Sequence, residues 1–217
     1  LISKYIKERS DCKVVFNGDG SDEVCGGYIY FHCAPDSIEF DKECKKLLSE
    51  IHFFDVLRSD RSISSHGLEA RTPFLDTNFV KTYLSIPANI RNHTENGQCE
   101  KYLLRKSFDN GLLPKEVLWR TKEAFSDGVS SQTRPWFQVI QEHIKDKIFN
   151  NNMLVNQYKF YKYNKPKTLE QLHYRMIFES YFPNCNLNII PKFWMPNFVD
   201  ATDASARTLG VYKLLKK

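Results

Sequence analysis

The sequence has no apolar run that approaches the roughly 18 residues needed to cross a bilayer. Its first residues, LISKYIKERS, lack the apolar stretch and the small-residue cleavage site of a signal peptide. Lysine and arginine exceed aspartate and glutamate by only 31 to 26, and they form no dense basic block. These absences argue against a membrane anchor and against a nucleic-acid-binding protein, so we expect a protein of the cytoplasm.

Metal-binding patterns are also missing. None of the six cysteines belongs to a C-x-x-C pair or has the spacing of a zinc site with histidine. We therefore expect reduced thiols, most of them packing residues. The six histidines form no i, i+4 pair, which favours polar surface or hydrogen-bonded core positions over metal ligands.

What the chain does contain is apolar residues, 41% of the total, spread along all 217 positions. This is enough for a substantial core in one globular domain, or at most two small ones. Apolar residues at steps of three and four predict an amphipathic helix over 37–59. The same spacing of apolar residues, in several cases bounded by prolines, predicts further helices over 77–86, 100–109, 135–150 and 168–182. Residues 183–217 have no clear period, and we expect them to form a tail on the surface.

A strand followed by a glycine-rich loop is the most informative feature of the chain. The β-branched and aromatic run at 12–16 predicts a buried strand. Residues 17–23, NGDGSDE, form a turn, and 24–32 resume an apolar pattern compatible with a helix. Because a parallel strand needs neighbours, we expect its sheet to lie largely upstream of residue 1.

The loop at 17–23 has two interpretations. Glycines 18 and 20 would let the backbone approach a ligand closely, and the unpaired N–H groups of a following helix attract phosphate. Its three carboxylates would repel a bare phosphate but suit Mg²⁺ placed between them and phosphate oxygens. The alternative is a plain helix N-terminus, with Ser21 as the cap and acidic residues in the first turn. Spacing alone favours this alternative, because a glycine-rich turn is a weak signal.

Two further segments carry charged residues. Residues 67–76, GLEARTPFLD, include a possible Glu69–Arg71 charge system, but the pattern alone favours a helix end, a proline turn and Asp76 as the next helix cap. Residues 119–128, WRTKEAFSDG, bring two cations to a Ser-Asp-Gly turn, and a lysine there could contact a polyphosphate. An ordinary surface lysine is the simpler explanation of that spacing.

Together and in this order, the segments resemble the C-terminal synthetase domain of glutamine-dependent asparagine synthetases. Residues 17–35, NGDGSDEVCGGYIYFHCAP, are similar to the family pattern S-G-E-G-S-D-E-V-F-G-G-Y-x-Y-F-H-x-A-P. The resemblance covers nearly the whole chain. It continues through DVLRSDRS at 55–62, GLEARTPFLD at 67–76, EKYLLRKSF at 100–108, LPKEVLWRTKEAFSDGV at 113–129 and ATDASARTLGVYK at 201–213.

The resemblance implies an α/β fold: an adenine-nucleotide α-hydrolase-like (PP-loop) synthetase domain, mainly helical here, with its parallel sheet only partly present. Residues 1–217 would be the C-terminal part of that domain. The N-terminal glutaminase domain and the S-G-G-x-D-S pyrophosphate-binding loop would be absent from the chain, which is therefore expected to be inactive alone. Dimerisation is a further family expectation.

The family's reaction converts aspartate and MgATP to β-aspartyl-AMP and pyrophosphate. Ammonia, taken from glutamine or used directly, then gives asparagine and AMP. The resemblance thus implies ATP and Mg²⁺ as cofactors. By position it assigns Asp19 to aspartyl-adenylate formation, Lys122 to pyrophosphate departure and Arg58 to the site. It assigns the binding of ATP to Asn17, Gly18, Gly20, Ser21 and Asp22, with Asp22 also at the Mg²⁺.

Two loop residues depart from the family pattern. Asn17 replaces a serine, and Asp19 replaces a glutamate and so reaches one methylene less far. A displacement of about 1 Å can cost on the order of 100-fold in rate where geometry is catalytic. These departures support a second hypothesis, a degenerate non-catalytic domain that serves interaction or regulation. A β-lactam synthetase-like cyclase is a third, disfavoured because 22–35 and 122–128 read closer to the asparagine enzymes.

Overall fold

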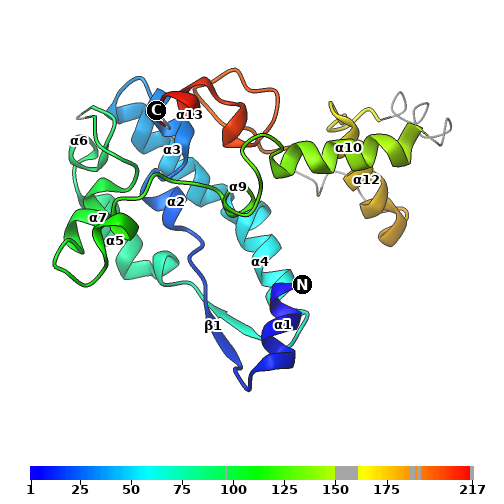
Figure 1. The fold of residues 1–217 in the computed structure, drawn as a ribbon, viewed down its shortest axis with the longest axis horizontal. Helices are drawn as coiled ribbons and strands as arrows, with labels where there is room; N and C mark the ends of the chain where they lie inside the picture. Colours follow the sequence, from blue (N-terminus) through cyan, green and yellow to red (C-terminus); the bar gives the residue numbers. More distant parts are fainter. Residues whose placement is uncertain (96, 150–160, 186–188, 190–191, 216–217) are drawn as a thin grey trace. The chain divides into compact units, whose positions relative to one another are not determined.

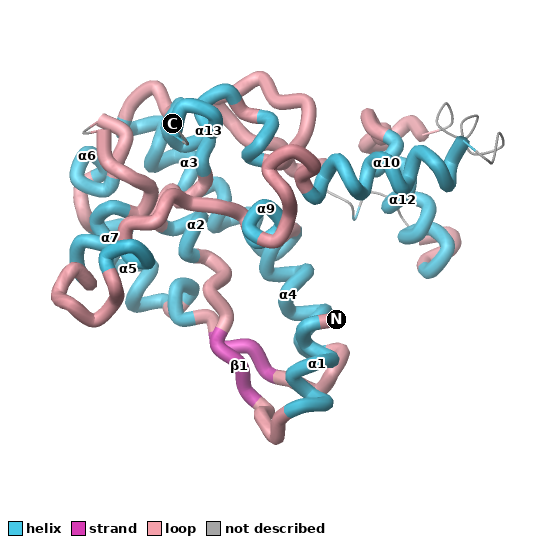
Figure 2. The backbone as a smooth tube through the Cα atoms, viewed as in Figure 1, coloured by secondary structure: helices cyan, strands magenta, loops and turns pink. Residues whose placement is uncertain are grey.

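A computed structural model gives the structure of the chain and describes every residue except 96, 150–160, 186–188, 190–191 and 216–217. The described residues form two compact units. The first unit contains residues 1–122, 196–202 and 208–217, and the second contains 123–195 and 203–207. The chain is mostly helical, and its described strands are confined to one short ribbon in the first unit (Figure 2).

The ribbon is a parallel pair, β1 (Val14–Phe16) and β2 (Glu69–Arg71), with Val15 opposite Ala70. β1 confirms the strand predicted within 12–16. The prediction that this strand is buried is wrong for the described residues, because β1 pairs with β2 alone and 84% of Phe16 is exposed. Figure 1 shows β1 leading through the glycine-rich loop into α2.

β2 also corrects the prediction for residues 67–76. The sequence there favoured a helix end, because glutamate and arginine have little strand preference. Pairing with β1 outweighs that preference and makes 69–71 a strand. The predicted Asp76 cap is confirmed, since its carboxylate accepts the N–H groups of Asn78 and Phe79 at 2.9 and 3.1 Å.

Helices make up most of the rest of the first unit (Figure 1). They are α1 (Ile2–Arg9), α2 (Ser21–Val24), η1 (Ile29–Cys33), α3 (Ser37–Glu50), η2 (Ile51–Phe53), α4 (Asp55–Ser64), η3 (Pro73–Leu75), α5 (Thr77–Ser85), α6 (Ala88–Arg91), α7 (Tyr102–Ser107), α8 (Lys115–Leu118) and α13 (Gly210–Leu215). The second unit contains α9 (Phe125–Gly128), α10 (Trp136–Phe149) and α12 (Leu169–Tyr181), and η5 (Ala206–Thr208) has residues of both units.

Two predicted helices are interrupted. The helix predicted over 37–59 divides into α3 and α4, because Phe54 takes φ −123° and ψ −103°, outside the helical region. The pattern over 24–32 is not one helix either. α2 ends at Val24, and Gly26 then adopts φ +62°, which breaks a right-handed helix before η1.

The other predicted helices are confirmed with shorter bounds, as α5, α7, α10 and α12. Residue 150 of the predicted 135–150 helix lies outside the described residues. The tail expected over 183–217 is corrected in part, since α13 is a helix that buries Tyr212, and Leu209 beside it is 4% exposed. Residues 186–188, 190–191 and 216–217 of that tail are not among those described.

The core of the first unit holds the loop region in place. Val24 and Cys25 have no exposed surface and pack with Tyr83 of α5. Phe31 and Phe40 are also fully buried, with ring centroids 5.0 Å apart in an edge-to-face arrangement. Burying each such phenyl ring contributes about 2 kcal/mol to the stability of the folded state. This packing stabilises the segment that follows the glycine-rich loop.

In the second unit, α10 packs against α12. Arg175 of α12 pairs with Glu179 at 2.9 Å, and the buried Asp127 has Arg207 beside it at 3.4 Å. Across the described parts of both units, no helix combines the length and the apolar character needed to span a bilayer.

The six cysteines are free, as the sequence predicted. Cys25 and Cys44 are buried packing residues, whereas Cys12 is exposed. Among the histidines, His32 is hydrogen-bonded, but neither ring nitrogen of the buried His93 has a hydrogen-bond partner in the described structure.

Candidate active site

The loop between β1 and α2 turns at Gly20. This residue has φ +90°, and a Cβ added to it would lie 2.3 Å from Cδ2 of Leu75, so the turn requires glycine. Gly18 has open space where its Cβ would be. Gly20, not Ser21, occupies the cap position of α2, which corrects the predicted serine cap.

Only one turn of helix follows the loop. Because α2 has four residues, its dipole is small, and the anion attraction expected from a long helix is not supplied by this element. Positive charge reaches the loop instead on two lysine side chains that are distant in sequence, Lys101 and Lys122.

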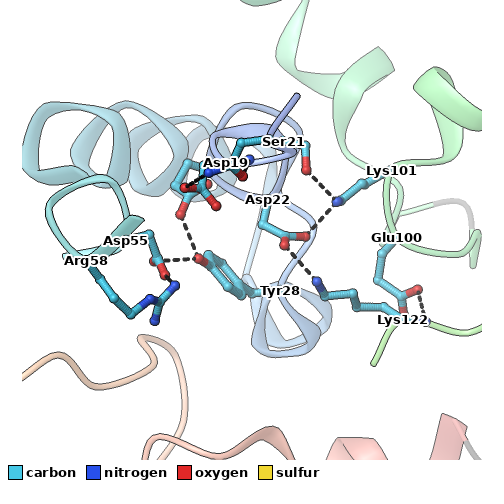
Figure 3. Close-up of polar contacts among 11 residues, drawn as sticks. Asp19, Ser21, Asp22, Tyr28, Asp55, Arg58, Glu100, Lys101 and Lys122 are labelled. Atoms are coloured by element: carbon cyan, nitrogen blue, oxygen red, sulfur yellow. Dashed lines mark hydrogen bonds and ion pairs between the residues drawn. The ribbon is translucent and has the colours of Figure 1, made fainter. Parts of the chain in front are cut away.

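These two lysines flank Asp22, as Figure 3 shows. Nζ of Lys122 lies 2.7 Å from one carboxylate oxygen of Asp22, and Nζ of Lys101 lies 2.8 Å from the other. Burial alone would raise the pKa of Asp22, but the two ammonium groups outweigh that effect and hold the pKa below its usual value. Asp22 is therefore ionised, and the group of three carries a net charge of +1.

Lys101 was not singled out from the sequence. It precedes α7 in a left-handed conformation, with φ 57° and ψ 29°, and its ammonium group also donates to Oγ of Ser21 at 2.9 Å. Gly27 makes room for the pair. A Cβ at this position would lie 2.2 Å from both Oδ1 of Asp22 and Cε of Lys101.

Asn17 and Asp19 are bound to each other. The Asn17 amide donates to the Asp19 carboxylate at 2.8 Å, and the Asp19 backbone N–H donates to the Asn17 amide oxygen at 3.0 Å. The two loop residues that depart from the family pattern thus form one hydrogen-bonded unit, which holds the shorter carboxylate at the loop.

The Tyr28 hydroxyl contacts two carboxylates. It lies 2.6 Å from Glu23 and 3.2 Å from Asp55, and Figure 3 shows the contact with Asp55. A tyrosine hydroxyl has a single hydrogen, so it cannot donate to both. Burial, together with the charges of Asp55 and Asp22, raises the pKa of Glu23 above its usual value. Arg58 pairs with Asp55, which connects it to the loop through Tyr28.

Of the residues assigned by resemblance, the structure therefore brings Asp22 and Lys122 into direct contact, with Ser21 joined to them through Lys101. Asn17 and Asp19 form a second group, and Arg58 stands further out, with 72% of its side chain exposed. Sequence reasoning missed Lys101, Tyr28 and Asp55. The adjacent Glu-Lys in EKYLLRKSF was the available signal for Lys101.

The arrangement suits a polyphosphate with a divalent cation. The described residues include no group of three metal-ligating side chains. Mg²⁺ does not need one, since it is usually held by one or two carboxylates together with substrate phosphates. Asp22 fits the carboxylate part of such a site, and the two lysines fit the phosphate part.

Comparison with known proteins shows which family the chain belongs to. A family model described as asparagine synthase matches residues 1–48 and 34–187. The chain belongs to the asparagine synthase family.

Curated relatives in this family are similar along the whole chain. It is 50% identical over 214 residues to "Asparagine synthetase [glutamine-hydrolyzing]" of Gallus gallus, covering 98% of the chain. Proteins of the same name from Homo sapiens and Bos taurus are 47% and 48% identical, over 98% and 100% of the chain. The chain spans 37–38% of the length of these relatives.

Proposed function

We propose that the chain is the C-terminal part of the synthetase domain of a glutamine-hydrolysing asparagine synthetase, a carbon–nitrogen ligase that makes asparagine from aspartate. The main observation that supports this proposal is that the Asp22 carboxylate lies between the Lys101 and Lys122 ammonium groups in a member of this family. Two ammonium groups beside one carboxylate suit the binding of MgATP and the departure of pyrophosphate.

In the proposed reaction, a β-carboxylate oxygen of aspartate attacks the α-phosphorus of ATP. The bond between the α-phosphorus and the bridging oxygen breaks, and pyrophosphate leaves with the electron pair. Ammonia then attacks the activated β-carbonyl carbon, AMP leaves, and a proton is lost to solvent or base. No protein nucleophile takes part, so the task of the site is electrostatic and protective.

We assign the residues as follows. Lys122 and Lys101 stabilise negative charge on the departing pyrophosphate, since an ammonium on a flexible stem can follow a moving phosphate. Asp19 lies at the aspartyl-adenylate, held by Asn17. Gly18, Gly20 and Ser21 contribute the ATP-facing loop, and Arg58 approaches the site from α4.

Asp22 would hold Mg²⁺, which when bound neutralises phosphate charge. Each Asp22 oxygen now faces a lysine. If Asp22 held Mg²⁺, Lys101 and Lys122 would be the neighbouring side chains available to pair with phosphate oxygens.

The remaining family properties belong to the same proposal. They are a PP-loop and a completed parallel sheet outside residues 1–217, an N-terminal glutaminase domain that supplies ammonia, a homodimer, a location in the cytoplasm, and inactivity of residues 1–217 alone. The exposed side chains of β1 support a completed sheet, because they leave an uncovered surface beside a single neighbour.

A degenerate domain is the second candidate. The substitutions at Asn17 and Asp19 favour it, because both fall in the loop that would contact ATP and aspartate. Their mutual hydrogen bonds favour the enzyme instead, because the shortened carboxylate keeps a fixed position.

Pyrophosphate release separates the two candidates. Full-length protein is assayed with aspartate, MgATP and ammonia, beside Lys122→Ala and the exposed control Lys115→Ala. We expect aspartate-dependent release from wild type and from the control, and a loss of at least 100-fold in Lys122→Ala. A well-folded wild-type protein that releases none would establish the degenerate domain.

A further inference from the structure

A buried carboxylate lies behind the two lysines. Glu100 is 1% exposed, and its Oε1 is 2.8 Å from Nε2 of His32. Its Oε2 accepts the backbone N–H of Lys122 at 3.4 Å. Burial would raise the pKa of Glu100, but these contacts outweigh it and lower the pKa below the usual value. A buried charge is tolerated only with such partners, so its position is closely specified.

Glu100 is connected to both lysines at once. It directly precedes Lys101, whose left-handed backbone aims the ammonium at Asp22. Its carboxylate binds the backbone of Lys122, whose ammonium reaches the other oxygen of Asp22. Figure 3 shows Glu100 and Lys122 on the same side of Asp22.

A second contact secures the same segment. Arg105 donates through Nε to the carbonyl of Glu100 at 2.8 Å, and through Nη1 to the carbonyls of Leu118 and Arg120 at 2.6 and 2.8 Å. The backbone before Lys122 is thus tied to the start of α7 at several points. These contacts fix the backbone from which the Lys122 side chain reaches Asp22.

His32 is itself held in place. Its ring packs edge-to-face on His93, with centroids 4.9 Å apart, and His93 is 1% exposed. Burial and the neighbouring His32 lower the pKa of His93 to about 4, so this ring is neutral near pH 7. The His32 ring that contacts Glu100 therefore packs against a buried, uncharged imidazole ring.

We propose that Glu100 is a positioning residue for the synthetase reaction, and that it acts by spanning from His32 to the backbone of Lys122. The proposal rests on the proposed role of Lys122 in pyrophosphate departure. The proposal concerns the length of the Glu100 side chain and not its charge, because the carboxyl group must contact His32 and Lys122 at the same time.

Two near-isosteric variants separate reach from charge. Glu100→Gln keeps the length of the side chain. Its amide oxygen can accept from Lys122 N–H while its NH₂ group donates to Nε2 of His32 in the tautomer that is protonated at Nδ1. Glu100→Asp keeps the charge but is shorter by about 1.5 Å, so it cannot make both contacts. The exposed Glu116 supplies matched control variants, Glu116→Gln and Glu116→Asp.

The variants are made in the full-length protein, and pyrophosphate release is measured with aspartate and MgATP varied. We expect Glu100→Asp to lower kcat by about 10- to 100-fold with the KM for aspartate unchanged, because the displaced group is Lys122. We expect Glu100→Gln to stay within about 3-fold of wild type, and both Glu116 variants to match wild type. Thermal unfolding of each variant verifies folding.

The outcomes are distinct. Equal activity of both Glu100 variants and wild type would overturn the positioning role, and so would a Glu100→Asp variant more active than Glu100→Gln. A fall in activity of Glu100→Asp that simply follows loss of folded protein would also overturn it. A folded wild-type protein without aspartate-dependent release would instead refute the proposed function on which the inference depends.

Discussion

Gly27→Ala tests the geometry around Asp22 directly. The added methyl carbon would lie 2.2 Å from Oδ1 of Asp22 and 2.2 Å from Cε of Lys101. Carbon atoms normally approach other heavy atoms to about 3.5 Å, so the shortfall is about 1.3 Å. The lysine side chain is the flexible partner and must move, which breaks its 2.8 Å ion pair with Asp22.

Overpacking of this kind costs about 1–3 kcal/mol of unfolding free energy. For a chain of this size, 2 kcal/mol corresponds to a fall in Tm of about 4–8 °C. Urea and thermal unfolding of the two variants Gly27→Ala and Gly18→Ala provide the measurement. Gly18→Ala is the matched control for stability, because its Cβ meets nothing within 4 Å, and we expect it within about 0.5 kcal/mol of wild type. Equal stability of Gly27→Ala and Gly18→Ala would refute the described packing.

Three further perturbations follow from the contacts. Asn17→Ala and Asp19→Ala should be non-additive in a double-mutant cycle by about 0.5–1.5 kcal/mol in urea unfolding, because each removes the same hydrogen bonds; simple additivity would show that the pair does not exist. The pKa of Glu23 is raised in the folded chain, so wild-type stability relative to Glu23→Gln should fall as pH rises through that pKa, and a pH-independent difference would contradict this. Asp36→Ala removes the cap that accepts two N–H groups at the start of α3 and should cost about 1 kcal/mol in thermal unfolding, whereas an unchanged Tm would dismiss the cap.

The sequence was sufficient to predict the helices and the strand that have a strong local pattern of residue types. Periodic apolar residues predicted α5, α10 and α12, and β-branched residues predicted β1. β2 could not be found in this way, because Glu69 and Arg71 take strand geometry only through pairing with a segment more than 50 residues earlier. The break at Phe54 likewise has no signal in residue type.

In the candidate site, too, the sequence predicted some residues, and others depend on tertiary structure. Motif resemblance selected Asp22 and Lys122, and the structure places them in contact across 100 residues of sequence. Lys101 escaped notice because its role depends on a left-handed backbone conformation before α7, which a lysine rarely adopts. The contact of Tyr28 with Asp55 depends on α4 approaching the loop, which is again a tertiary property.

The central claim is that the Asp22–Lys101–Lys122 group serves transfer of AMP to aspartate. The most direct measurement uses aspartate labelled with oxygen-18 in its side-chain carboxylate, with full-length protein, MgATP and ammonia, and mass analysis of the products. The proposed reaction predicts that each AMP carries a labelled oxygen from aspartate, and that Lys122→Ala abolishes this transfer. Asparagine formed with unlabelled AMP, or label transfer undiminished in Lys122→Ala, would contradict the account.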